Sequence, residues 1–263
     1  YIVINILYKY GEFMIKVLVN GCNGKMGNIV CDLALKNDLF ELIGGFDINS
    51  NVNCNFPIFT NINDINIKPD VIIDFSVPVA TLNILNYAIN EKIPIVIATT
   101  GFTDEQNDFI EKCSKEIPIF KSANMSFDIM IMKKIVSYLA PIFRDTDIEI
   151  IETHHNRKID SPSGTAQMLA DSINTSLNNS LHYEYNRHSK HQKRDKNEIG
   201  ISSIRGGNIV GEHEVKFFGE FETFEIKHTS YSRNIFAKGA LKASQFIVKQ
   251  SAGLYTMEDL FSI

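Results

Sequence analysis

Short apolar runs separated by amphipathic stretches fill the first half of the chain. Buried strands are predicted at residues 15–19, 40–46, 71–75, 95–98 and 118–120. Apolar residues at helical spacing predict helices at 28–36, 79–92 and 103–115. Strands that alternate with helices in this way form a parallel sheet covered on both faces. The pattern therefore predicts a Rossmann-like, doubly wound α/β domain.

The pattern changes after a predicted helix at 127–139. Residues 147–152 alternate like a half-buried strand, and a helix is predicted from Thr165. Antiparallel strands with a Gly206-Gly207 turn are predicted at 200–205, 209–218 and 221–228, followed by a helix at about 235–250. We therefore expect a domain at 14–125 and a second α+β domain at 126–234 with a mostly antiparallel, open sheet. We expect residues 235–263 to pack back on the first domain.

Composition indicates a globular protein. A chain of 263 residues with 44% hydrophobic residues can bury a full core. Its apolar runs are shorter than the roughly 18 residues that a membrane span needs, so we predict no membrane partner. Residues 1–13 precede the first methionine and lack the charged start and cleavage site of a signal peptide. We interpret them as a non-native or upstream extension.

The charge distribution argues against nucleic acid as a partner. The formal net charge is −5, and the totals imply no large basic face. The local exception is the basic cluster at 187–196. It fits a solvated loop and a cover over an anionic ligand about equally well.

Cysteine usage indicates a reducing, cytoplasmic environment. The four cysteines, at 22, 31, 54 and 113, form no C-x-x-C pair, so we expect reduced thiols. Cys22 lies in a glycine-rich loop, where a small filler is a better interpretation than a redox group because no neighbouring residue in the sequence would activate it.

That glycine-rich loop connects the first predicted strand to the first predicted helix. Gly21, Gly24 and Gly27 form G-x-x-G-x-x-G, a variant of the dinucleotide-binding fingerprint. The second strand ends at Asp47, about 20 residues after the last glycine, where an acidic side chain would bind the ribose hydroxyls. These features predict a dinucleotide site in the first domain. Its residues are Gly21, Cys22, Asn23, Gly24, Lys25, Met26, Gly27 and Asp47.

Two later loops are expected to complete the cofactor crevice. Ligands of doubly wound sheets bind beyond the carboxyl ends of the strands. We expect the nicotinamide near Ala98, Thr99, Thr100, Ser122, Ala123, Asn124 and Met125.

The segment 152–165 combines two imidazoles, two cations and a helix start on a strand-to-helix loop. The N–H groups of Ser163, Gly164 and Thr165 would lie at the positive end of the helix, which is a seat for a carboxylate or phosphate. His154 and Lys158 lie beside that seat. A proton donor and a cation next to an anion cradle predict a site that binds and protonates an acidic small molecule. A polar loop with a capped helix is the alternative if the segment is considered by itself.

Five segments together resemble the 4-hydroxy-tetrahydrodipicolinate reductase (dihydrodipicolinate reductase) family over essentially residues 14–263. They are residues 21–27, 98–102, 122–126, 154–165 and 205–213. The resemblance implies reduction of a cyclic imine dicarboxylate by NADH or NADPH in diaminopimelate and lysine biosynthesis. It also implies a substrate domain whose open sheet builds a homotetramer. By position, His154 would be the proton donor or acceptor and Lys158 a proton donor, with substrate contacts at His155, Gly164 and Thr165.

The chain departs from the family in two places. Ser189, Lys190 and Gln192 replace glycines that many relatives carry, which leaves the conformation of the 187–196 loop open. Ile48 follows Asp47 where some relatives place an arginine able to hold a 2′-phosphate. We therefore expect NADH to be used at least as well as NADPH.

Three alternatives come from other classes of protein. A metal-dependent hydrolase would use His154 and His155 with one further histidine, at 188, 191 or 213. Adjacent histidines point in different directions, and no H-E-x-x-H motif or cysteine cluster is present, so we predict no metal site. A redox-sensing NADH-binding protein would need no His154 and Lys158 beside an anion cradle. A dehydrogenase with a cysteine nucleophile would need a cysteine near the second-domain loop, where the sequence has none.

Overall fold

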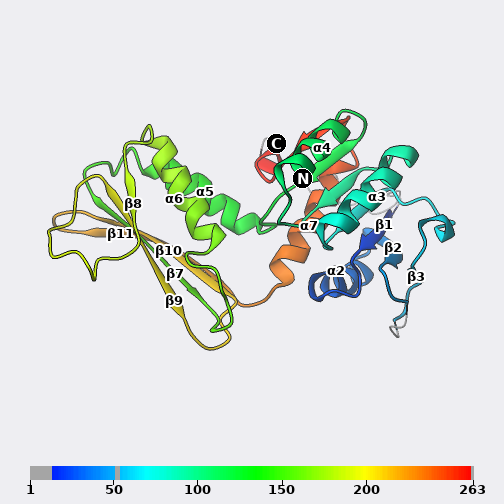
Figure 1. Ribbon diagram of the computed structural model, residues 1–263, viewed down its shortest axis with the longest axis horizontal. Coiled ribbons are helices and arrows are strands. Elements are labelled where there is room, and N and C mark those ends of the chain that lie inside the picture. The colour runs from blue at the N-terminus through cyan, green and yellow to red at the C-terminus, as the bar shows by residue number, and fades with distance from the viewer. Residues whose placement is uncertain (1–13, 51–53, 262–263) are drawn as a thin grey trace, which may run out of the picture. The chain divides into compact units, whose positions relative to one another are not determined.

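The structure is a computed structural model that describes residues 14–50 and 54–261. The predicted extension at 1–13 lies outside these residues. The chain divides into two compact units (Figure 1). The first contains the described residues up to Met125 together with those from Asn234 onward, and the second contains Ser126–Arg233.

The first unit is built on a seven-stranded sheet in the order β12-β6-β5-β4-β1-β2-β3. Every neighbouring pair is parallel. The strands are β1 (Ile15–Asn20), β2 (Phe40–Phe46), β3 (Ile58–Phe59), β4 (Val71–Asp74), β5 (Ile95–Ile97), β6 (Pro118–Lys121) and β12 (Gly253–Tyr255). The doubly wound α/β prediction is confirmed.

Helices cover both faces of this sheet. They are α2 (Lys25–Leu35), α3 (Pro78–Glu91), α4 (Asp104–Cys113) and α7 (Asn234–Ile247), with short 3-10 turns η1 (Ile62–Asp64) and η2 (Asp259–Phe261). Helix α7 packs on α2, and α3 packs on α4 (Figure 1). Because helices lie on both faces, a central strand must be apolar on both sides, and Val71, Ile72 and Ile73 are indeed fully buried.

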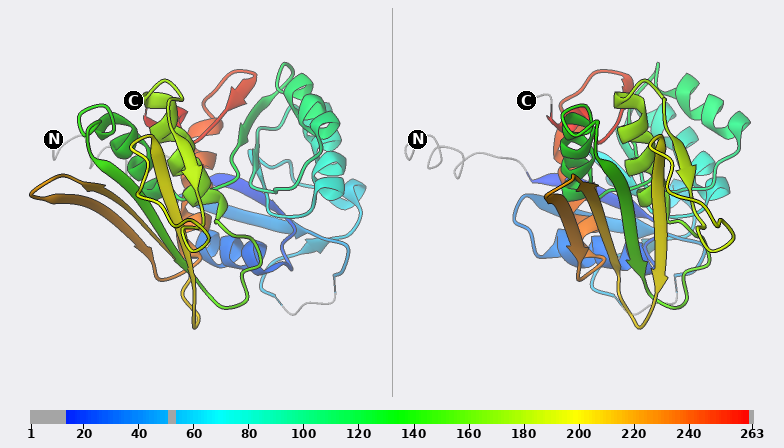
Figure 2. Two further views of the ribbon diagram at one scale, coloured as in Figure 1. Left: turned by 60° about the vertical axis from the view of Figure 1, so that its left-hand side comes forward. Right: turned by 90° about the vertical axis from the view of Figure 1, so that its left-hand side faces the viewer.

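The second unit contains a five-stranded sheet in the order β11-β10-β7-β9-β8. The strands are β7 (Asp147–His154), β8 (His182–Glu184), β9 (Glu198–Arg205), β10 (Gly211–Phe218) and β11 (Thr223–Ser230). Two helices, α5 (Phe127–Leu139) and α6 (Gly164–Ser176), pack on each other and cover one face (Figure 2). Alternate residues of β7 and β10, such as Ile148, Ile150, Val215 and Phe217, form the core beneath them.

The pairing within this sheet corrects one prediction. Strands β10 and β11, and β10 and β7, are antiparallel as expected, but β9 runs parallel to both β7 and β8. The sheet is therefore mixed. The Gly206-Gly207 turn does not join neighbouring strands, because β7 lies between β9 and β10. Alternation along a strand gives its buried face but not its neighbours, which is why the sequence suggested a simple hairpin.

The loop between β9 and β10 instead crosses the carboxyl end of β7 and binds it. Gly206 N–H donates to His154 O at 2.9 Å, and His155 N–H donates to Ile209 O at 2.8 Å. Gly207 takes a φ of +51°, a conformation that favours glycine. This loop therefore fixes the backbone on either side of His154.

The sequence analysis missed β3, β8 and β12. Each is only two or three residues long, which is too short for a periodic pattern. Across residues 14–50 and 54–261, none of the helices has the length and apolar character needed to cross a membrane.

Candidate active site

The glycine-rich loop needs glycine for steric reasons. Gly21 has a φ of +77°, and a Cβ there would lie 2.6 Å from Phe75 O. A Cβ at Gly27 would overlap Gly21 O. The loop thus folds tightly against the start of α2 and the end of β4.

The start of α2 has the character of an anion site. Gly24 is its N-cap residue, and none of the described side chains caps the helix. No acidic residue lies in the first turn, and Lys25 is exposed there. Because the first N–H groups of a helix carry a partial positive charge, this end is suited to a pyrophosphate.

Asp47 lies against the same loop. Its Oδ2 accepts from Asn23 N–H at 3.0 Å, and its Oδ1 accepts from Ile48 N–H at 2.8 Å. Cys22 is buried, and burial together with the charge of Asp47 raises the pKa of its thiol to about 12. Cys22 is therefore a protonated packing residue in this loop.

A buried carboxyl group ties the ends of β1 and β4, the first turn of α3 and the loop after β5 together. Asp74, at the end of β4, is fully buried and accepts hydrogen bonds from four side chains. The donors are Asn20 Nδ2 at 2.7 Å, Ser76 Oγ at 2.5 Å, Thr81 Oγ1 at 2.6 Å and Thr99 Oγ1 at 2.8 Å. Burial raises the pKa of Asp74, and the four donors oppose that shift. The sequence analysis did not identify this group.

The remaining cofactor candidates occupy the neighbouring loops of the first unit. Thr99 is buried and its hydroxyl binds Asp74, whereas Thr100 is exposed. Ala98 N–H donates to Asp74 O at 2.9 Å. In the loop after β6, Ser122 Oγ donates to Asn124 O at 2.7 Å, Ala123 is exposed and Met125 is buried.

In the second unit, a buried carboxylate contacts the first histidine of the predicted site. Glu152 is fully buried on β7, and its Oε2 lies 2.6 Å from His154 Nδ1. Arg205 makes a two-pronged contact with the same carboxylate, at 2.6 Å and 2.8 Å. Ser163 N–H donates to Glu152 Oε1 at 3.1 Å. Segments distant in the sequence thus converge on one side chain.

A second buried histidine packs beside this group. His213 lies opposite Glu152 across the β7–β10 pair, and its ring contacts that of His154 with centroids 5.1 Å apart. Its Nε2 is hydrogen-bonded to Ser163 Oγ at 2.9 Å. Burial, followed by the charge of His154, lowers the pKa of His213 to about 3, so this imidazole is neutral at physiological pH.

The predicted cation carries a counterion of its own. Lys158 Nζ lies 2.8 Å and 2.7 Å from the two carboxylate oxygens of Asp160. The Lys158 side chain is 19% exposed and that of Asp160 is 61% exposed. The Nδ1 atom of the neighbouring His155 is buried and has no hydrogen-bond partner among the described residues.

The start of α6 lies beside Glu152 and His213. Ser163 is the N-cap residue, and its Oγ accepts from Ala166 N–H at 3.1 Å. Because Ser163 N–H is bound to Glu152, the first turn presents Gly164 and Thr165 as the next N–H groups of the helix. A hollow of about 470 Å³ adjoins the loop and is lined by Ser161, Pro162, Tyr185, Ile201 and Ser203.

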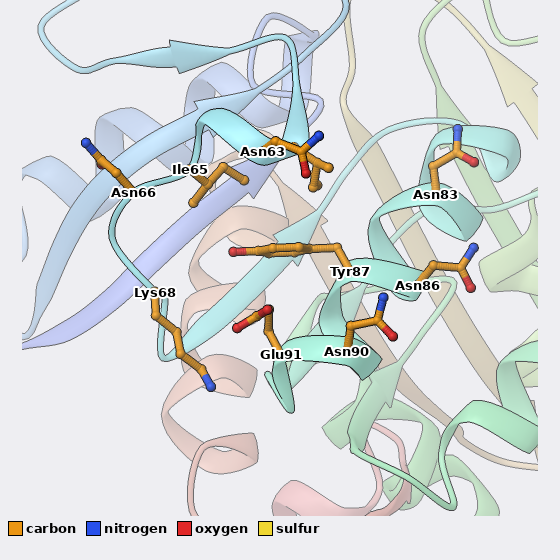
Figure 3. A pocket seen from close by; sticks show the side chains of 10 residues that line it. Asn63, Ile65, Asn66, Lys68, Asn83, Asn86, Tyr87, Asn90 and Glu91 are labelled. Atoms are coloured by element: carbon orange, nitrogen blue, oxygen red, sulfur yellow. The ribbon is translucent and has the colours of Figure 1, made fainter.

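Another hollow lies elsewhere in the first unit. It has a volume of about 570 Å³ and is bounded by α3 and by the segment that follows β3 (Figure 3). Figure 3 shows Tyr87 at its centre, with asparagines along α3 beside it. None of the residues that line it belongs to the predicted site.

The basic cluster at 187–196 is largely paired with carboxylates of its own unit. Arg187 binds Glu149 and Glu198, and Lys190 binds Glu184. Arg194 reaches three carboxylates, those of Asp147, Glu149 and Glu198. These ion pairs therefore hold the 187–196 loop against the second sheet. Within the described part of the chain, no three His, Cys, Asp or Glu side chains form a group able to hold a metal ion.

Comparison with known proteins gives a direct result for both units. Residues 15–125 match the family model described as dihydrodipicolinate reductase, N-terminus, and residues 128–261 match the model of the C-terminus. This chain belongs to the dihydrodipicolinate reductase family. The family predicted from five short segments of the sequence is therefore confirmed.

Individual relatives agree with this result over nearly their whole length. A 4-hydroxy-tetrahydrodipicolinate reductase of Caldanaerobacter subterraneus subsp. tengcongensis is 48% identical over 247 residues, which cover 94% of this chain and 98% of that protein. The Clostridium tetani protein of the same name is 47% identical over 246 residues and covers 93% and 96%.

Solved structures show the same similarity. A dipicolinate-bound dihydrodipicolinate reductase from Paenisporosarcina sp. TG-14 superimposes with a TM-score of 0.78 and 27% identity, covering 93% of this chain and 98% of that chain. A diaminopimelate dehydrogenase of C. glutamicum, 12% identical with a TM-score of 0.57, is similar in fold alone.

The structure brings His154, Ser163 and Lys158 into one loop region and adds three partners that the sequence analysis did not assign. These are Glu152, Arg205 and His213. The sequence does contain a signal for Glu152. Residues two positions apart on a strand share a face, and His154 lies two positions after Glu152. No comparable signal connects Arg205 to Glu152, since β9 meets β7 only through the fold.

Proposed function

We propose that the loop between β7 and α6 of this reductase binds and protonates the substrate, while the loops of the first unit hold NAD(P)H. The reaction is the reduction of 4-hydroxy-tetrahydrodipicolinate to tetrahydrodipicolinate, a step of diaminopimelate and lysine biosynthesis. The observation that carries this proposal is the joint presence of His154, Lys158 and the start of α6 in one unit.

The residues of the first unit fit a dinucleotide. The uncapped start of α2 suits the pyrophosphate, and Asp47 ends β2 where ribose hydroxyls are bound in such folds. When bound, the reduced nicotinamide supplies the hydride that the reaction needs. Ile48 is 87% exposed and offers no cation for a 2′-phosphate. We therefore expect NADH to be used at least as well as NADPH.

The substrate of this reaction is a dicarboxylate, and the second unit supplies matching positive groups. Lys158 and the first turn of α6 at Gly164 and Thr165 provide positive charge for carboxylates. His155 lies next to His154 and is a further substrate contact in this proposal. The dipicolinate named in the related Paenisporosarcina structure is a dicarboxylate of this kind.

Three proton transfers accompany the hydride transfer. Loss of the substrate hydroxyl as water needs an acid at the oxygen and a base at the adjacent carbon, which is acidic because it neighbours the imine. The Lys158 ammonium serves as the acid, and neutral His154 serves as the base. After hydride addition, His154 returns its proton to the same carbon. The sum is one hydride and one proton taken up and one water released.

We further propose a homotetramer, assembled through the face of the second sheet opposite α5 and α6. That face carries charged pairs, including Lys227 with Glu212 at 2.9 Å and Lys216 with Glu214 at 2.9 Å. It also exposes the apolar side chains of Ile204 and Phe218. An open sheet face of this kind supports pairing with a second copy. Light scattering at micromolar concentration tests the proposal, and a fully active monomer would contradict it.

The catalytic proposal is tested by following NADH and NADPH absorbance with the product of dihydrodipicolinate synthase as substrate. Oxidation of the cofactor that depends on this substrate is the expected result. Absence of turnover with both cofactors would reject the proposed function.

We also propose a cytoplasmic location for the protein. The free state of all four cysteines is in keeping with it.

A further inference from the structure

The most constrained acidic group of the second unit is Glu152. Its side chain is wholly buried, and burial of a carboxylate is costly unless hydrogen bonds compensate. Both of its oxygens are engaged: Oε1 accepts from Arg205 Nη2 and Ser163 N–H, and Oε2 lies within hydrogen-bond distance of Arg205 Nη1 and His154 Nδ1. The proposed mechanism above assigns this carboxylate no role.

The surroundings keep Glu152 ionised. Burial raises the pKa of its carboxyl group, but hydrogen bonds from Arg205, Ser203 and His154 outweigh burial and bring the pKa to about 2. An ionised carboxylate has no proton to donate and can only accept. The 2.6 Å contact therefore requires that His154 Nδ1 carries the proton.

This requirement determines the state of the other ring nitrogen. Burial lowers the pKa of His154, with Glu152 opposing the shift, so the ring is neutral at physiological pH. A neutral imidazole carries one proton, and with that proton on Nδ1 the lone pair is on Nε2. Residue 211 is glycine, and a Cβ there would lie 3.0 Å from His154 Nε2. Glycine at this position thus leaves the side of Nε2 that faces residue 211 free of a side chain.

We infer that Glu152, held by Arg205 and Ser163 N–H, is a positioning residue that fixes His154 in the Nδ1–H tautomer and so presents Nε2 as the atom that exchanges a proton with the substrate. The inference rests on the proposed function, because it assigns the atom used by the proposed base. Arg205 has a separate part, since its guanidinium compensates the buried charge of Glu152.

A purely structural role for the Glu152–Arg205 pair is the alternative interpretation. The pair joins β7 to β9, and an ion pair that only links the two strands would affect the stability of the protein, independently of where His154 carries its proton. The tautomer of His154 therefore distinguishes the two interpretations, and NMR of the full-length protein with ¹⁵N-labelled histidine measures it directly. The His154 signals are assigned by their loss in His154→Gln.

The expected result is the Nδ1–H neutral tautomer of His154 in the wild-type protein near neutral pH. A dominant Nε2–H tautomer would overturn the inference, and this measurement needs no variant of Glu152 that folds. It also requires no turnover, so it stands apart from the proposed function, which fails if the wild-type protein oxidises neither cofactor with the substrate.

The second measurement uses Glu152→Gln. A carboxamide can donate to Nδ1, so the proton of His154 is expected to move to Nε2. The kcat is then expected to fall roughly 10- to 100-fold, as activity does when the carboxylate partners of metal-binding histidines are replaced, with an unchanged KM for NADH. A wild-type kcat and tautomer in Glu152→Gln would overturn the inference.

Glu198→Gln is the matched control. Glu198 is also a buried acid of this sheet that pairs with an arginine, Arg187. Its ion-pair partners among the described residues are His182, Arg187 and Arg194, and His154 is not one of them. Its loss removes the same charge from the same unit and is expected to leave kcat and the His154 tautomer at wild-type values. An equal fall of kcat in both variants would show that lost charge, and not the tautomer, is responsible, and the inference would be wrong.

Discussion

Lys158 Nζ lies 2.7 Å from Asp160 Oδ2, so the cation proposed to bind a substrate carboxylate already has a carboxylate within the protein. Substrate binding must therefore compete with Asp160 or share the ammonium with it. Exposed ion pairs contribute about 0.2–1 kcal/mol, so Asp160→Asn is expected to lower the KM for the dicarboxylate by at most about fivefold. Steady-state kinetics with NADH held in excess measures this KM. An increased KM would instead mean that Asp160 positions Lys158.

Replacing either proposed proton-transfer residue is expected to affect turnover more than cofactor binding. General acid–base catalysis contributes about 10²–10⁴-fold, so His154→Gln and Lys158→Met should lower kcat by amounts in that range. Lys158→Met should also raise the KM for the dicarboxylate, because it removes a cation from the anion site. Fluorescence titration should give an unchanged Kd for NADH. A Lys158→Met enzyme within a few-fold of wild type would refute the assignment.

The exposed position after Asp47 is expected to control cofactor choice. Ile48→Arg places a cation where a 2′-phosphate would lie, and hydrogen bonds to charged groups contribute about 1.5–3 kcal/mol. The ratio of kcat/KM for NADPH to that for NADH should therefore rise about tenfold or more. Ile142→Arg, at another exposed isoleucine, controls for the added charge and should leave the ratio unchanged. An unchanged ratio in Ile48→Arg would place the 2′-hydroxyl elsewhere.

His213 is expected to make the second unit sensitive to acid. Its pKa is about 3 in the fold against an ordinary value of 6.5, so below pH 6.5 the unfolded state binds a proton that the folded state does not. Stability should therefore fall as pH decreases from 6.5 towards 3. Denaturant titrations across this range should show a flatter dependence for His213→Gln. An equally steep dependence in the variant would assign the effect to other groups.

The carboxyl group of Asp74 is expected to stabilise the first unit. Asp74→Ala leaves the amide of Asn20 and three hydroxyl groups without their buried acceptor. Each unsatisfied buried group costs about 1–3 kcal/mol, so the midpoint of thermal unfolding should fall clearly. Asp38→Ala, at an exposed acid of the same unit, should have little effect. Equal midpoints for the two variants would contradict the prediction.

The fold of the first unit could be predicted because strands that are buried on both faces appear in the sequence as continuous apolar runs. Strands such as Val71–Asp74 are apolar runs, and short helices separate them in the sequence. The second sheet was harder to predict. Its strands β9 and β10 follow one another and are both amphipathic, yet β7 lies between them. Alternation carries no information about such an insertion, because the same faces are buried in either arrangement.

The candidate site also has a part that the sequence predicts and a part that it does not. His154, Lys158 and the start of α6 are close in sequence, so their chemistry could be read from one segment. Glu152 was identifiable in principle through its spacing from His154. Arg205 reaches Glu152 only through the parallel register in which His154 pairs with Arg205, and that register is a property of the folded sheet. Long-range partners of this kind could not be obtained from local patterns.

Strand β12 pairs with β6, with Gly253 opposite Pro118, and α7 packs on α2. During synthesis on the ribosome, the first unit must therefore wait for residues 234–255, which emerge after the whole second unit. In the interval, β6 is an open strand edge, the kind of surface that pairs with other chains. The second unit has no such dependence. Vectorial folding thus favours completion of the inserted unit before the unit that begins the chain.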